Sequence, residues 1–104
     1  MLLSDKAWQF DTKAIDKAIA LDASERDWYQ KDMLNAFTRY AYYRYKQIRD
    51  CVNTRKCKHM TVDKVRANLN DGAKLAFTVR LLKISPEEIN YIVDFSDNHL
   101  EYIK

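Results

Sequence analysis

The sequence predicts an all-α fold: a compact four- or five-helix bundle with one long central helix at about 25–52. Glycine and proline occur once each in 104 residues, whereas ordinary chains contain about 7% glycine and about 5% proline. Because the tight turns of β-hairpins usually need glycine, this composition favours helices. Apolar residues also recur at helical spacings of three and four. We therefore expect residues 1–104 to form a single helical domain.

Two helices are predicted in the first half of the chain. The first, at about 11–21, has one apolar face, formed by Ala14, Ile15, Ala18 and Ile19. The second is the long helix, which we expect to open at Ser24–Asp27 with Ser24 as its N-cap and to end near Val52. Its apolar line comprises Met33, Leu34, Phe37, Tyr40, Ala41, Arg44, Ile48, Cys51 and Val52.

Two further helices are predicted after residue 60. Thr61 is the expected cap of a third helix that continues to Val79, with Gly72, Ala73 and Ala76 small enough to let a partner helix approach closely. A strand after the turn signal at 70–72 is the alternative, and we favour the helix because the chain offers no second strand for pairing. The last helix begins at Ser85–Glu88, where serine, proline and glutamate occupy the positions of a capping box.

Several function classes are excluded or disfavoured by composition. Phosphate-binding loops and dinucleotide fingerprints need more than one glycine, and the aromatic content argues against a wholly disordered chain. The chain contains neither an apolar run of about 18 residues nor a secretory signal pattern at its start. We expect a cytoplasmic protein without a membrane partner. No pair or triad of catalytic groups occurs at a recognisable spacing, so we expect a non-enzymatic protein without a cofactor.

The charge of the chain is concentrated in its middle. Residues 39–59 carry a net charge of +6, whereas residues 1–38 carry −2 and residues 60–104 carry −1. The outward face of the long helix and the basic loop after it contribute the candidate binding residues Arg39, Tyr42, Tyr43, Lys46, Arg49, Arg55, Lys56, Lys58 and His59. Closely spaced cations suit phosphates, and aromatic rings stack on unpaired bases.

This basic, tyrosine-rich segment favours a small domain that contacts nucleic acid or a nucleoprotein. The alternatives are an adaptor or inhibitor that docks an acidic protein partner on the same surface, and a homodimer formed through the tyrosine face. A solvated helix face whose tyrosines lean on neighbouring helices is the structural alternative.

Two other motifs, a helix–turn–helix pattern and a set of potential metal ligands, give weaker indications of function. Residues 78–89 have the apolar spacing of a helix–turn–helix, but Lys83 stands at the usual turn glycine and the following helix is acidic, which is unsuited to DNA. Potential metal ligands are Cys51, Cys57, His59 and His99, but the spacing of the first three matches no common zinc site. We expect two free thiols and no metal, although a disulfide between the cysteines is an alternative.

Arg44 is the one charged residue on the apolar line of the long helix. We expect it either to extend past the edge of the bundle or to pair with a carboxylate of the last helix, such as Asp94 or Asp97. An ion pair of this kind fixes the register of two helices. The variant Arg44→Ala should therefore have a lower melting temperature, and an unchanged melting curve would contradict the ion pair.

Overall fold

The computed structural model describes residues 10–53 and 60–98. Within them the chain forms five α-helices and one short 3₁₀ turn, and no strand. The elements in order are α2 (Thr12–Ala20), η1 (Ala23–Glu25), α3 (Trp28–Val52), α4 (Val62–Leu69), α5 (Gly72–Leu82) and α6 (Pro86–Asn98). The predicted all-α class and the long central helix are confirmed.

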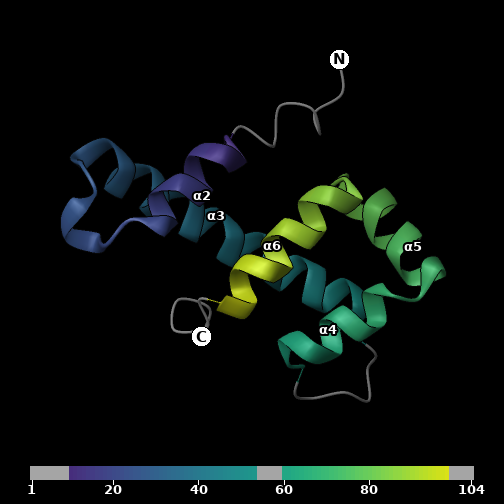
Figure 1. Ribbon diagram of the computed structural model, residues 1–104. Helices are drawn as coiled ribbons and strands as arrows, with labels where there is room; N and C mark the ends of the chain where they lie inside the picture. Colours follow the sequence, from purple (N-terminus) through teal and green to yellow (C-terminus); the bar gives the residue numbers. More distant parts are fainter. Residues whose placement is uncertain (1–9, 54–59, 99–104) are drawn as a thin grey trace.

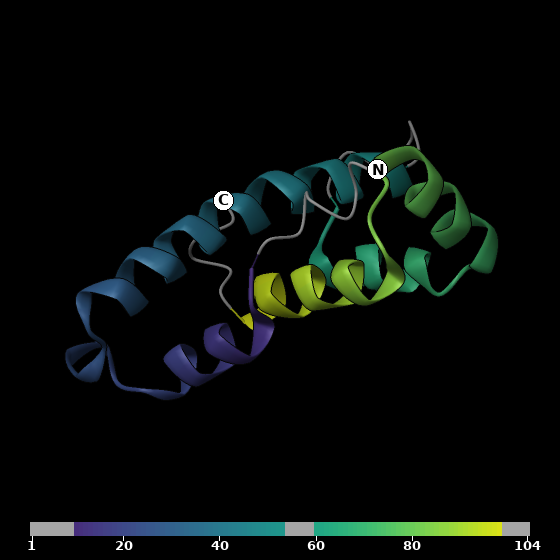
Figure 2. The same ribbon diagram turned by 90° about the horizontal axis from the view of Figure 1, so that it is seen from above.

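The long helix α3 spans the molecule, and the other four α-helices all contact it. Figure 1 shows α2 and α5 at opposite ends of the molecule, with α6 between them. Figure 2 shows α2 and α6 following one another along the same side of α3. No helix within residues 10–53 and 60–98 is both long enough and apolar enough to cross a membrane.

The start of α3 differs from the prediction. Asp27, and not Ser24, is the N-cap: its carboxylate accepts a hydrogen bond from Gln30 N at 2.7 Å, while Gln30 Oε1 accepts one from Asp27 N at 3.1 Å. This reciprocal capping box satisfies two backbone donors at once. Ser24 instead lies in η1, a separate 3₁₀ turn that connects α2 to α3.

The predicted third helix is two helices, with a break at Asn70 and Asp71. Thr61 caps α4 as expected, but the Asp71 carboxylate accepts hydrogen bonds from Ala73 N and Lys74 N and starts α5. Gly72 is therefore the first residue of α5. A Cβ atom at Gly72 would meet nothing within 4 Å, so no other helix of the described residues approaches closely there. The preference for helix over strand in this region is confirmed.

The connection from α5 to α6 explains why Lys83 can replace the turn glycine of a helix–turn–helix. Lys83 caps α5 in the left-handed conformation, with φ 55° and ψ 42°. Ser85 Oγ then accepts a hydrogen bond from Glu88 N at 3.2 Å, which is the serine half of the predicted capping box, whereas the Glu88 carboxylate accepts a hydrogen bond from Tyr40. The following helix α6 packs its apolar face on α3 and leaves Glu87, Asp94 and Asp97 exposed. It thus presents carboxylates to solvent and no cation within the described residues.

The core is centred on Phe37 of α3, which is fully buried. Its ring centroid lies 4.8 Å from that of Phe95 and 5.7 Å from that of Tyr91, both on α6, and 5.3 Å from that of Phe10. All three pairs are edge-to-face, the arrangement that aligns positive ring edges with negative ring faces. Four of the five helices contribute further buried side chains to the same cluster: Ile15, Ile48, Val65, Ile89 and Ile92.

Arg44 joins α3 to α6 through Tyr40. Its Nε donates to Tyr40 Oη at 3.3 Å, and Tyr40 Oη donates to Glu88 Oε2 at 2.7 Å. The carboxylate that Arg44 faces is therefore Glu88 on the first turn of α6, and not Asp94 or Asp97. Asp94 pairs with Arg66 of α4 at 2.7 Å.

Burial raises the pKa of both partners of this hydrogen bond. Burial raises the pKa of Glu88 above its ordinary value of 4.5, against the opposing effects of the Tyr40 hydrogen bond and the Arg44 charge. Burial and the Glu88 hydrogen bond raise the pKa of Tyr40 to about 12. Tyr40 consequently keeps its proton at neutral pH and remains the donor.

The raised pKa of Glu88 predicts a pH-dependent stability. Because the folded state holds this proton to a higher pH than the unfolded state does, the free energy of unfolding should fall as pH rises from 4.5 through the folded-state pKa. Glu88→Gln keeps an acceptor for Tyr40 but removes the titration. Its stability relative to the natural protein should therefore increase over that pH range, as urea unfolding would measure. Glu87→Gln, at the exposed neighbouring position, is the control. If the free energy of unfolding of both variants depended on pH in the same way, this account would be contradicted.

Candidate functional site

Three of the predicted binding residues lie on one exposed line of α3. Arg39, Tyr43 and Lys46 are all exposed, and Tyr43 retains 62% of its accessible surface. At 100° and 1.5 Å per residue they fall within about 60° of one another, and Arg39 and Lys46 are about 10 Å apart along the helix axis. We call these three residues the basic face. One aromatic ring is thus flanked along the helix by a cation about one turn away in each direction.

Tyr42 and Arg49 are placed differently from the basic face. Tyr42 is half-buried, and Lys46 Nζ lies 5.1 Å from the centroid of its ring. This cation–π contact holds the lysine stem against the helix surface. Arg49 is also half-buried and pairs with Asp50 at 3.3 Å. Tyr42 therefore offers less surface for stacking than Tyr43, and the charge of Arg49 is partly offset by its neighbour.

The remaining predicted binding residues Arg55, Lys56, Lys58 and His59 lie outside the described residues. The same holds for two potential metal ligands, Cys57 and His99, whereas Cys51 has a free, half-buried thiol. No group of three or more potential metal-ligating side chains occurs in the described part of the chain.

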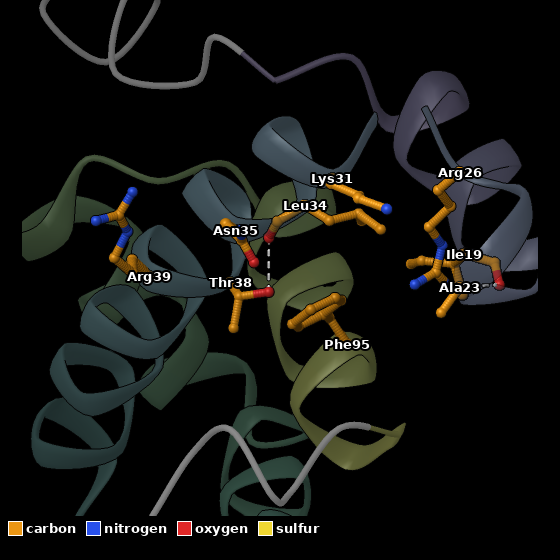
Figure 3. A pocket seen from close by; sticks show the side chains of 9 residues that line it. All are labelled: Ile19, Ala23, Arg26, Lys31, Leu34, Asn35, Thr38, Arg39 and Phe95. Carbon is orange, nitrogen blue, oxygen red and sulfur yellow. Dashed lines mark hydrogen bonds between the residues drawn. The ribbon is translucent and has the colours of Figure 1, made fainter. Parts of the chain in front are cut away.

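A groove of about 700 Å³ opens beside the amino-terminal half of α3. Figure 3 shows its wall of Leu34 and Thr38 from α3 facing Phe95 of α6, with Ile19 and Ala23 across from them. Three basic side chains also line it, Arg26, Lys31 and Arg39, and no acidic residue does so among the described lining residues.

Arg26 has a structural role in this groove. Its Nε donates to Ala18 O at 2.7 Å and its Nη2 donates to Ile19 O at 3.3 Å. These are carbonyls of the last turn of α2, where helical partners run out; Ala18 O also accepts a hydrogen bond from Leu21 N at 3.3 Å. The guanidinium therefore both caps α2 and adds positive charge to the groove.

The groove was not predicted from the sequence, because its walls come from segments about 75 residues apart. Only Arg39 belongs both to the basic face and to the groove. Arg39 is thus shared by the two surfaces, the basic face with the exposed ring of Tyr43 and the partly apolar groove. Comparisons with protein-family models, curated proteins and solved structures find no match to this chain.

Proposed function

We propose that this protein is a non-enzymatic domain that binds single-stranded nucleic acid, free or within a nucleoprotein, through the basic face of α3. The observation that favours this function is the exposure of Tyr43 between Arg39 and Lys46. An exposed tyrosine ring can stack on any base, whatever the sequence of the strand, and the flanking cations contact the phosphates on either side of that base. A base must be unpaired to stack in this way, so the proposal is for a single strand.

The charge distribution of the sequence supports this proposal. The basic face begins the segment 39–59, which carries a net charge of +6. Arg55, Lys56 and Lys58, which belong to the same segment of the sequence, add three of its cations. Neutralising phosphates releases counterions, and this gives the binding a strong dependence on salt.

Tyr43→Leu should weaken binding of a labelled single-stranded oligonucleotide, as fluorescence anisotropy would measure. Loss of one stacked base costs about 1–3 kcal/mol, which corresponds to a Kd roughly 5- to 150-fold higher. Tyr29→Leu is a matched control, because Tyr29 lies on the same helix and is also 62% exposed. Equal affinities of the two variants would contradict a stacking role for Tyr43.

Lys46→Gln should reduce the salt dependence of binding. Each phosphate contact contributes about 0.7 to the slope of log K against log salt for a single strand, so the variant should lose about that amount. Lys64→Gln, an exposed lysine of α4 away from the basic face, should keep the full slope. An unchanged slope for Lys46→Gln would show that this lysine contacts no phosphate.

A second candidate function is the docking of an acidic protein segment, and the groove favours it. An apolar recess with three cations at its edge suits a peptide that carries carboxylates next to an apolar side chain. Lys31 distinguishes the two functions because it lines the groove but does not belong to the basic face. A protein partner that Lys31→Glu releases and Tyr43→Leu retains would favour the second function.

A further inference from the structure

The outer face of α5 is largely apolar. It consists of the exposed residues Gly72, Ala73, Ala76, Phe77, Arg80 and Leu81, which we call the α5 face. Phe77 is 53% exposed and Leu81 is 59% exposed, while the only fully buried residue of this helix is the polar Thr78. Leu75, Val79 and Leu82 of α5 pack against the core, as the large apolar side chains of a helix that packs within its own chain normally do, whereas Phe77 and Leu81 remain exposed on the other side. This pattern indicates that α5 has a second contact surface.

No described element of the chain covers the α5 face. Figures 1 and 2 show α5 at the end of the molecule opposite η1. The space beyond Gly72 is open, since a Cβ atom there would meet nothing within 4 Å. The small residues that were expected to admit a helix therefore face outward, beside the exposed Phe77.

The α5 face is complementary in shape to itself. Its amino-terminal half carries only small residues, Gly72, Ala73 and Ala76. Its carboxyl-terminal half carries the large side chains of Phe77 and Leu81. When two copies of α5 lie antiparallel, the large half of each covers the small half of the other. A two-fold axis requires this kind of match, in which residue i contacts residue j and j contacts i. A parallel arrangement would instead place large against large and small against small.

The charges of the α5 face are complementary under the same two-fold axis. Asp71 lies at the amino end of α5, and the exposed Arg80 and Lys83 lie at its carboxyl end. Antiparallel pairing brings the carboxylate of each copy toward the cations of the other. It also places the positive amino end of each helix dipole beside the negative carboxyl end of its partner.

We propose that the α5 face is the interface of a homodimer, in which a second copy of this chain packs its own α5 antiparallel across a two-fold axis. An 11-residue helix is only about 16 Å long. The contact is therefore smaller than the roughly 800 Å² per partner of a standard stable interface. We expect a weak, reversible dimer with a Kd of about 1 µM to about 1 mM.

Sedimentation velocity over that concentration range tests the proposal. The natural protein should shift from monomer to dimer, and Phe77→Glu and Arg80→Glu should stay monomeric with unchanged circular dichroism. Both residues are exposed, so neither change should prevent folding. Tyr29→Glu and Tyr43→Glu are matched controls that should still dimerise. A natural protein that stays monomeric, a Phe77→Glu variant that still dimerises, or a dimer that Tyr43→Glu separates would each overturn the proposal.

Cross-linking tests the antiparallel arrangement. Ala76 lies near the middle of α5, so a two-fold axis brings the two copies of this position together. With Cys51 and Cys57 replaced by serine, Ala76→Cys should form a disulfide-linked dimer under mild oxidation. The exposed position Lys64→Cys on α4 should not do so. Equal cross-linking at both positions would overturn the specific pairing.

Discussion

The packing of Phe37 against α6 determines which side of α3 faces solvent. Phe37 is fully buried among rings from α3, α6 and the segment before α2, and this contact fixes the rotation of the 25-residue helix about its axis. At 100° per residue, Arg39, Tyr43 and Lys46 lie about 180° to 240° away from Phe37. The basic face is therefore exposed because the opposite line of the same helix is buried. A helix rotated by half a turn would bury these cations without partners, which is strongly unfavourable.

Much of this architecture follows from local sequence signals, and the differences arise where two signals compete. The end of α3 and the caps Thr61 and Ser85 were predictable because capping depends on side chains within three residues. Ser24 and Asp27 are both good N-caps, and only the reciprocal bond with Gln30 decides between them. The break before Gly72 was ambiguous because the same residues suit a turn and a helix. The link from Tyr40 to Glu88 joins residues 48 positions apart, and no local pattern carries that information.

The candidate site was predictable as a basic, aromatic segment but not as a surface. Consecutive residues of a helix point in directions about 100° apart. An error of that size in the predicted rotation of α3 about its axis would exchange the exposed Tyr43 with the half-buried Tyr42. The groove is formed jointly by residues of α2, α3 and α6, so it depends on how these helices pack together. The basic face and the α5 face use different residues on different helices, so occupation of one leaves the residues of the other available.

The binding of a single strand by the exposed line of α3 is the central claim, and chemical-shift mapping tests it most directly. In a titration of isotope-labelled protein with a single-stranded oligonucleotide, the largest changes should centre on residues 39–46, with Tyr29 and the α5 face unaffected. Changes centred on Lys31 and the groove, changes centred on α5, or no changes at low salt would contradict the claim.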